Sequence, residues 1–345
     1  MTKKIKGNTV KWGIIGVGDV CEVKSAPAMQ LIEHSELVAV MRRNTEKAID
    51  YARRHQVPKW YDQAEDLIND PDVNAIYIAT PPNAHAELTE LAAKARKPVY
   101  VEKPMARSLA ECEQMIAACK KADVPLYIAY YRRGLPNFLK LKQLIESGII
   151  GEIRLVKIAL YKSSKPDIIA KTIESMPENW RVNPEIAGGG YFFDLASHQF
   201  DYLDFVFGPI QSVSGAAGNQ AELYPAADIV TSQFTFKNGI QGIGSWCFTV
   251  DEIVTNDELT IIGTTGKLSI PFFGEPEIIL ENSNSKRKKK FKFALPKHIQ
   301  QPLLQTIVDD LLGTGNCPST GESAARTNWV LEEITKNYYK NLYEL

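Results

Sequence analysis

Short apolar runs alternate with amphipathic stretches through the first third of the chain. Each run is bounded by glycine, proline or polar residues, and the stretch after it has apolar positions at helical spacing. Strand and helix in such alternation predict a doubly wound parallel sheet, the α/β Rossmann-type architecture. The predicted strands are VKWGII, ELVAVM (36–41), NAIYIAT (74–80), KPVYVEKP and PLYIAY, and the predicted helices include 86–95 and 109–122.

After Tyr131 the pattern changes to a helix that ends at a glycine, followed by longer runs typical of antiparallel strands. Asn238-Gly239 indicates a tight hairpin turn between two of them. We therefore expect two domains, an α/β Rossmann-type domain over 1–129 and a second domain over 130–345. The second is predicted to be an α+β domain with a large, mainly antiparallel open sheet, closed by C-terminal helices over 302–312 and 323–342.

Composition narrows the classes of protein. A length of 345 residues suits two domains, and a net charge of −1 provides no bulk field to attract nucleic acid or an anionic membrane. The five cysteines include no CxxC pair, no apolar run approaches the ~20 residues of a membrane span, and the N-terminus lacks a signal-peptide pattern. These features favour a cytoplasmic protein. The basic run KRKKKFKF (286–293) indicates a lysine-protected edge strand rather than a nucleic-acid site.

A glycine pair follows the first predicted strand. Gly16 and Gly18 precede a helical pattern, although the third position of the GxGxxG motif is Cys21. The first glycine permits a tight turn, the second lets a pyrophosphate approach the backbone, and the helix start offers free N–H groups. The segment predicts a dinucleotide site formed by Gly16, Gly18, Asp19 and Val20.

Further cofactor contacts are expected where the other parallel strands end, because ligands bind beyond their carboxyl ends. Such ends carry Thr80-Pro81-Pro82 and Glu102-Lys103-Pro104. His85 is either a cofactor-side residue or a packing residue.

The end of the second strand bears on the choice of coenzyme. No acidic residue occurs from Leu37 to Thr45, and Arg42 and Arg43 stand where an NAD-preferring sheet carries an acid for the ribose hydroxyl. Arginines suit a 2′-phosphate, so we expect NADP, with NAD as an alternative. Solvated loop charges are the competing interpretation.

The stretch IAGGGYFFDLASHQFDYL (186–203) places Asp194 and His198 four residues apart on one helix face. The glycines either let the backbone approach a ligand, with both side chains directed at it, or form a bare turn beside an ordinary buried hydrogen bond. No metal is expected, because no third ligand lies nearby in the sequence.

The motifs Gly16-x-Gly18, ATPPNAH, VEKP, YYRR, SGIIGEI, NWR and GGGYFFDLASHQFDYL occur in this order and with these gaps. The chain resembles the Gfo/Idh/MocA oxidoreductases, the group of glucose–fructose oxidoreductase and inositol dehydrogenase, from about Val10 to the last helix. The resemblance implies that the glycines bring Asp194 and His198 to the nicotinamide, with Lys103 opposite on the first domain. It also implies that the domain over 1–129 is dinucleotide-binding, and that the domain over 130–345 binds the substrate and forms a homodimer or homotetramer through the open sheet.

The resemblance further implies hydride transfer between a nicotinamide and a polyhydroxylated small molecule: a sugar, a cyclitol or a related diol. The proton then passes to Lys103 or His198, while Asp194 orients the histidine or binds a substrate hydroxyl. Tyr131, Arg133, Trp180 and Arg181 are candidate substrate contacts, or core and ion-pair residues. A dinucleotide-assisted glycosidase, a binding-only sensor and a reductase of a non-sugar substrate are the alternatives.

Overall fold

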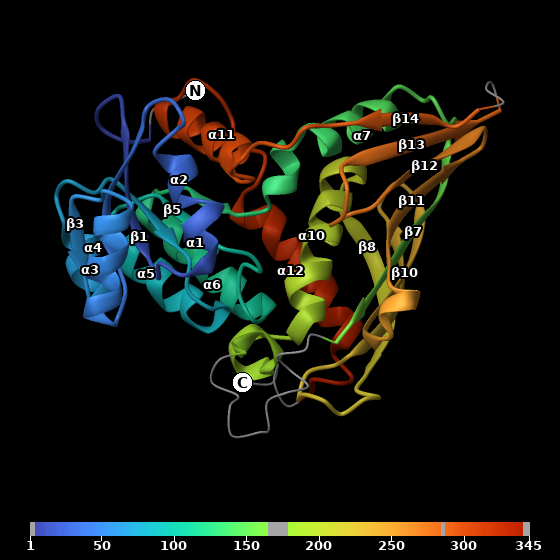
Figure 1. The fold of residues 1–345 in the computed structure, drawn as a ribbon, viewed down its shortest axis with the longest axis horizontal. Coiled ribbons are helices and arrows are strands. Elements are labelled where there is room, and N and C mark those ends of the chain that lie inside the picture. The colour runs from blue at the N-terminus through green and yellow to red at the C-terminus, as the bar shows by residue number, and fades with distance from the viewer. Residues whose placement is uncertain (1–3, 165–178, 284–286, 341–345) are drawn as a thin grey trace. The chain divides into compact units, whose positions relative to one another are not determined.

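The computed structural model describes residues 4–164, 179–283 and 287–340. Contacts divide the chain into two compact units, Met1–Leu135 with Pro296–Ala325, and Pro136–Leu295 with Arg326–Leu345 (Figure 1). The division falls inside a helix near the C-terminus.

The first unit holds a parallel sheet with the strand order β3-β2-β1-β4-β5-β6. Its central strands are buried along their whole length, which explains their continuous apolar sequence. The strands are β1 (Val10–Ile15), β2 (Ser35–Met41), β3 (Lys59–Tyr61), β4 (Ala75–Ile78), β5 (Val99–Val101) and β6 (Leu126–Ile128). The expected doubly wound sheet is therefore confirmed, with β1 and β4 adjacent where the strand order changes direction.

Helices cover both faces of this sheet, as the strand order requires. They are α1 (Asp19–Val23), α2 (Ala26–Met29), α3 (Thr45–Arg54), α4 (Ala64–Asn69), α5 (His85–Lys94), α6 (Leu109–Ala122) and α11 (Gln301–Leu312), with the 3₁₀ turns η1 (Pro82–Ala84) and η2 (Tyr131–Gly134). The strand β3 and the helices α3 and α4 were not predicted from the sequence.

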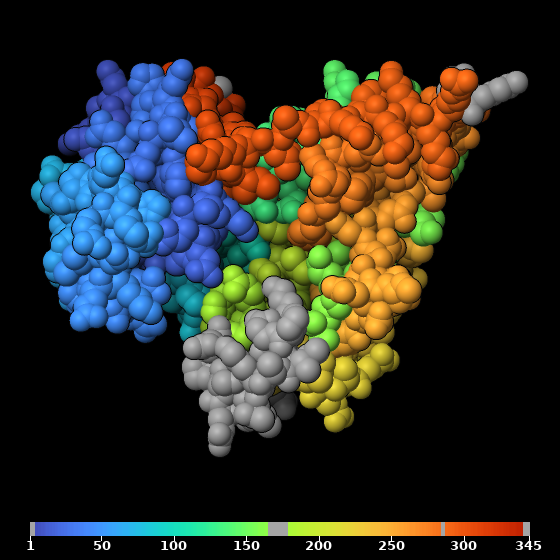
Figure 2. Space-filling model, in the orientation of Figure 1, coloured from blue at the N-terminus to red at the C-terminus, as the bar shows by residue number. Residues whose placement is uncertain are grey.

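The return of the C-terminal segment to the first unit differs from the predicted domain division, which assigned all of 130–345 to the second domain. In the structure, α11 lies against the N-terminal elements, as the orange-red and blue regions show (Figures 1 and 2). Its buried apolar positions recur at helical spacing, and Asp310 accepts hydrogen bonds from Lys4 Nζ at 2.7 Å and Tyr127 Oη at 2.9 Å. The sequence alone does not show against which of the two domains the apolar face of α11 packs.

The second unit holds a sheet with the order β14-β13-β12-β11-β7-β10-β9-β8. Neighbouring strands are antiparallel except for β7 and β10, so the mainly antiparallel prediction is confirmed. The strands are β7 (Ile153–Ser163), β8 (Ile210–Gly218), β9 (Ile229–Phe236), β10 (Gln241–Val250), β11 (Asn256–Gly263), β12 (Gly266–Ile270), β13 (Glu277–Asn282) and β14 (Lys289–Lys292). The Asn238-Gly239 turn joins β9 to β10, and Gly239 has a φ of 88°.

One face of this sheet packs on α10 (Gly190–Phe207), while side chains of its other face, Ile243 among them, are exposed within the described residues. The other elements outside the sheet are α7 (Pro136–Glu146), α9 (Pro184–Ala187), α12 (Gly321–Thr335) and the 3₁₀ turns η4 (Trp180–Val182) and η5 (Glu252–Val254). Trp246 of β10 donates from Nε1 to Gln199 Oε1 of α10 at 2.7 Å, in a buried contact. The last helix, expected to reach residue 342, ends at Thr335 within the described residues.

The basic run near residue 290 forms an edge strand, as expected from its lysines. The described strand β14 lies at the end of the sheet, and Lys290 Nζ lies 2.8 Å from Glu277 Oε1 on β13. Lys288 pairs with Glu281 on the same neighbouring strand. These charges therefore balance each other across two strands. Lys286, the first residue of the run, lies outside the described residues.

Candidate functional site

The glycine loop after β1 has the conformation that its sequence predicted. Gly16 has a φ of 91°, and a Cβ there would lie 2.7 Å from Thr80 Cγ2 and 3.0 Å from the Thr80 nitrogen. Around Gly18 the nearest atom to an added Cβ is the Gly16 oxygen at 4.0 Å, so the backbone is accessible there. Asp19 is exposed and Val20 partly buried at the start of α1. The loop therefore combines a left-handed turn with backbone that a phosphate group can approach.

Thr80 links this loop to the end of β4. Its backbone packs against Gly16, and its Oγ1 is buried without a hydrogen-bond partner in the described part of the chain. Pro81 precedes the η1 turn, and Pro82 is buried within it. An accessible glycine backbone beside an unsatisfied buried hydroxyl fits the polar phosphate and ribose groups of a dinucleotide.

His85 is wholly buried between two strand-end loops, and its ring in the neutral form donates a hydrogen bond to only one of them. Its Nε2 lies 2.8 Å from the Thr80 carbonyl oxygen, and its Nδ1 lies 3.1 Å from that of Met105. Burial lowers the pKa of His85, while the two carbonyls and the Glu102 carboxylate act in the opposite direction. Since the ring has no exposed surface, it would support a cofactor through these loops rather than touch it.

Lys103 is partly exposed at the end of β5, directly after the buried Glu102. The Lys103 backbone N–H donates to Glu102 Oε2 at 3.1 Å, and the following peptide bond to Pro104 is cis. Tyr77 and Gln300 both donate to the other carboxylate oxygen at 2.6 Å. Gln300 was not identified from sequence, because it stands 198 positions away with no motif around it.

Arg42 reaches back to the glycine loop from the end of β2. Its Nη1 donates to the Val17 carbonyl oxygen at 3.0 Å, and its side chain is partly buried. Arg43 is exposed beside it. The structure thus places Arg42 against the predicted dinucleotide loop, and its role toward the coenzyme stays a prediction.

Backbone conformation and close contacts within the second unit explain the three glycines at the start of α10. Gly188 and Gly190 have φ values of 86° and 66°, and a Cβ on Gly190 would lie 2.4 Å from Ala226 Cβ. A Cβ on Gly189 would lie 2.1 Å from the Phe193 ring. A turn and close packing therefore account for the triplet without a ligand.

Asp194 and His198 share one face of α10, as their spacing predicted. Arg181 Nε lies 3.8 Å from Asp194 Oδ2, and the Arg181 guanidinium lies 4.4 Å from the centre of the Trp180 ring. His198 is 4% exposed. The structure therefore groups Trp180, Arg181 and Asp194 into one partly exposed cluster.

Two predicted substrate contacts lie in the first unit. Arg133 is 4% exposed, and its Nη1 donates to the Pro318 carbonyl oxygen at 2.7 Å. Tyr131 is also buried, and the Arg132 guanidinium lies 5.0 Å from its ring centre. The Arg133 contact ties the C-terminal segment to the first unit, which favours the structural alternative for this residue.

Phe273 was missed in the sequence and lies beside His198, with 6.2 Å between the ring centres. Its loop is held by Asp257, whose carboxylate accepts from the backbone N–H groups of Phe272, Phe273 and Gly274 at 2.9, 2.6 and 2.8 Å. An aspartate at a strand start gives no sequence signal for such a contact.

Lys103 lies in the first unit and Asp194 and His198 in the second, so their predicted cooperation stays a prediction. Within residues 4–164, 179–283 and 287–340, no three His, Cys, Asp or Glu side chains are grouped to hold a metal ion. In the same ranges, no helix has the length and apolar character to cross a membrane.

The buried state of His85 leads to a prediction about stability and pH. Its folded pKa lies below the ordinary 6.5, so below that pH the unfolded chain takes up a proton that the folded chain resists. The stability of the parent should therefore fall more steeply between about pH 7.5 and 5.5 than that of His85→Gln. Urea unfolding at both pH values measures this. Equal slopes for the two proteins would contradict it.

Comparison with known proteins supports a Rossmann domain followed by a second domain. Residues 10–130 match the model of an oxidoreductase family with an NAD-binding Rossmann fold, and residues 138–269 match a GFO/IDH/MocA C-terminal domain. Oxidoreductase P35 of Formosa agariphila is 38% identical over 323 residues, covering 94% of this chain and 97% of its own. The myo-inositol 2-dehydrogenase of Thermotoga maritima is 26% identical, covering 86% of this chain and 85% of its own.

The fold is also found in solved structures. Levoglucosan dehydrogenase, in complex with NADH and levoglucosan, superposes with a TM-score of 0.85 at 20% identity, over 96% of this chain and 98% of that one. Both domains of the family model match, and together they span most of the sequence. The chain therefore belongs to the GFO/IDH/MocA family of oxidoreductases, enzymes with an NAD-binding Rossmann domain.

Proposed function

We propose that the protein is an NADP-preferring dehydrogenase or reductase of a polyhydroxylated small molecule: a sugar, a cyclitol or a related diol. The observation that carries the proposal is the joining of the glycine loop, the end of β4 and Glu102-Lys103 in one unit, through Thr80 and His85. The relative named for myo-inositol supports a polyol substrate.

The reaction requires a hydride acceptor and a proton acceptor. A bound nicotinamide would supply the hydride chemistry. We assign the role of proton acceptor to Lys103. Its backbone is held at the end of β5 by the hydrogen bond to Glu102, and its side chain is partly exposed. Asp194 and His198 are proposed to bind and orient the reacting hydroxyl, with Trp180 and Arg181 contacting the remainder of the substrate.

Replacing Lys103 tests the proposed proton transfer. Lys103→Met should lower turnover of a polyol by about 10²-fold or more, the usual contribution of a general acid or base, and change coenzyme affinity far less. A panel of sugars, inositols and diols, followed by the absorbance of the reduced nicotinamide, supplies the substrate. Lys94→Met, on the exposed surface of α5, is the control. Near-normal turnover in Lys103→Met would remove this lysine from the chemistry.

The preference for NADP rests on Arg42 and Arg43. The Arg42 guanidinium, which already contacts the glycine loop through Nη1, retains further N–H donors in a planar fork suited to phosphate oxygens. Arg43 is exposed directly after it and would add a second positive charge. The end of β2 carries no carboxylate that would repel a 2′-phosphate.

The two arginines should have separable effects on coenzyme affinity. Arg43→Ala should weaken NADP and leave NAD almost unchanged, whereas Arg42→Ala should also weaken NAD, because it removes the contact with Val17. One charge-assisted bond of about 1.5–3 kcal/mol corresponds to a roughly 10- to 100-fold preference. Titration of both dinucleotides measures it, with the exposed Arg53→Ala as control. A parent protein that binds NAD as tightly as NADP would refute the preference.

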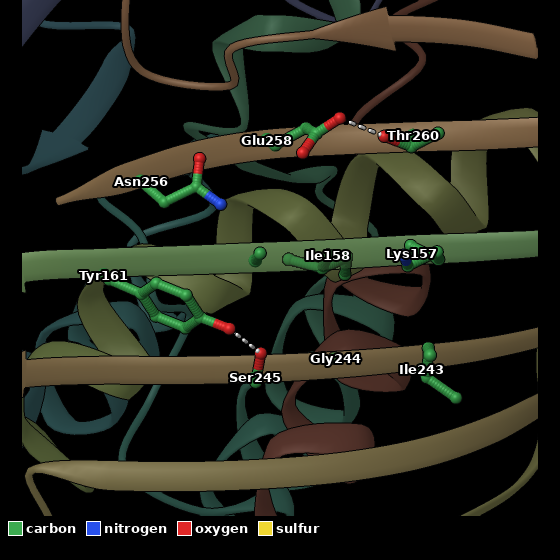
Figure 3. A pocket seen from close by; sticks show the side chains of 10 residues that line it. Lys157, Ile158, Tyr161, Ile243, Gly244, Ser245, Asn256, Glu258 and Thr260 are labelled. Atoms are coloured by element: carbon green, nitrogen blue, oxygen red, sulfur yellow. Dashed lines mark hydrogen bonds between the residues drawn. The ribbon is translucent and has the colours of Figure 1, made fainter. Parts of the chain in front are cut away.

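The open face of the second sheet is the proposed oligomer interface. Figure 3 shows side chains of β7, β10 and β11 on this face, where Tyr161 and Ser245 are joined by a hydrogen bond of 2.7 Å. Ile243 is 44% exposed among these polar side chains. A second copy packed on the face would bury an isoleucine that the single chain leaves in water.

A charge in this face should therefore separate the subunits. Ile243→Glu is expected to convert a dimer or tetramer into a smaller species in sedimentation velocity, with the fold unchanged by circular dichroism. Ile49→Glu, at a 42% exposed residue of α3 in the first unit, is the matched control. If the parent is monomeric, or if Ile243→Glu sediments like the parent, the open face is not the interface.

A further inference from the structure

The buried Glu102 carboxylate obtains its hydrogen bonds from three parts of the first unit. It is 7% exposed at the end of β5, and its Oε1 accepts from Tyr77 Oη of β4 and from Gln300 Nε2, each at 2.6 Å. Its Oε2 accepts from the Lys103 backbone N–H at 3.1 Å. Neutral donors therefore fix both oxygens of a charged group that is almost removed from water.

Chemistry determines the orientation of the Gln300 amide. A carboxylate only accepts, so the amide nitrogen must face Glu102, and the amide oxygen is left for the Tyr100 hydroxyl at 2.9 Å. Gln300 is wholly buried, and Tyr77 and Tyr100 stack with 4.8 Å between their ring centres. Burial raises the pKa of both tyrosines well above 10.0, which keeps their hydroxyls protonated as donors.

Attachment of the C-terminal segment does not require this network. The segment is also tied to the first unit by Arg133 with Pro318, by Tyr127 with Asp310 and by His298 with the Val23 carbonyl oxygen. Gln300 is distinct because it contacts a carboxylate at a strand's carboxyl end, where ligands bind in such sheets. The same carboxylate restrains the backbone from which the Lys103 side chain leaves.

We propose that Gln300 is a positioning residue of the coenzyme site, acting through Glu102. By holding the carboxylate, it fixes the start of the Lys103 loop and keeps a negative charge at the end of β5. Such a charge favours the positively charged oxidised nicotinamide over the neutral reduced form. The identity of the coenzyme rests on the proposed function above.

Removal of the amide should therefore distinguish the two redox forms of the coenzyme. Gln300→Met keeps the side-chain length and removes both hydrogen bonds. We expect it to weaken the oxidised dinucleotide about tenfold and the reduced one less than about twofold, within the range for a lost bond to a charged group. Titrations without substrate measure both affinities. Turnover should fall about tenfold as well, with KM for the polyol changed less than about twofold.

Two companion variants examine the route of the effect. Glu102→Gln removes the charge and should shift the ratio of the two affinities in the same direction, by at least as much. Tyr77→Phe removes the other donor to Oε1, so its effect and that of Gln300→Met should be non-additive. Gln305→Met, a partly exposed glutamine of α11 with partners at Glu33 and Asp309, is the control.

The result that overturns the proposal is an unchanged affinity ratio. If Gln300→Met lowers the melting temperature but binds both redox forms like the parent, or weakens both equally, the residue is only structural. Should that variant not fold, Tyr100→Phe removes the partner of Gln300 Oε1, and a ratio equal to that of the parent is again negative. A parent that binds neither dinucleotide refutes the proposed function instead. A parent that binds both without oxidising a polyol refutes only the substrate, and the titrations still test Gln300.

Discussion

A carboxylate removed from water must receive hydrogen bonds from the chain around it, and in the first unit Glu102 imposes this requirement. Its partners come from β4, from the residue that follows it, and from the segment before α11. If the C-terminal segment lay elsewhere, one oxygen would lose a donor at a cost of about 1–3 kcal/mol or more. Glu102, at the strand end that carries Lys103, therefore has all its hydrogen bonds only when the C-terminal segment packs on the first unit and brings Gln300 to it.

The strand ends beside this carboxylate are linked by backbone packing and by one buried side chain. Thr80 packs on Gly16, and His85 spans from the Thr80 carbonyl to that of Met105. Rigid positioning of this kind is what coenzyme binding requires, because a loosely held loop would have to be ordered at each binding event. Residues expected to touch the cofactor thus divide into those with accessible surface, such as Gly18 and Lys103, and a buried support, His85.

The two faces of the sheet in the second unit differ in burial. One face packs on α10, with Trp246 and Gln199 bonded in the core, and the helix presents Asp194 and His198. The other face keeps Ile243 and polar side chains exposed. Asp257 orders a loop whose Phe273 ring lies next to His198, so the surroundings of this histidine depend on a residue from a strand start.

The sequence by itself determined the fold class, the family and the principal motifs, because these depend on local periodicity and on short spacings. The individual strands, the Gly16 turn and the Asn238-Gly239 hairpin were confirmed, since each of these segments depends on residues that are near in the chain. Only the tertiary structure decided which unit holds α11, that Arg133 bonds Pro318, and that Gln300 reaches Glu102. These contacts join residues 185 and 198 positions apart, and no local pattern distinguishes a buried glutamine or arginine that has such a partner from one that faces water.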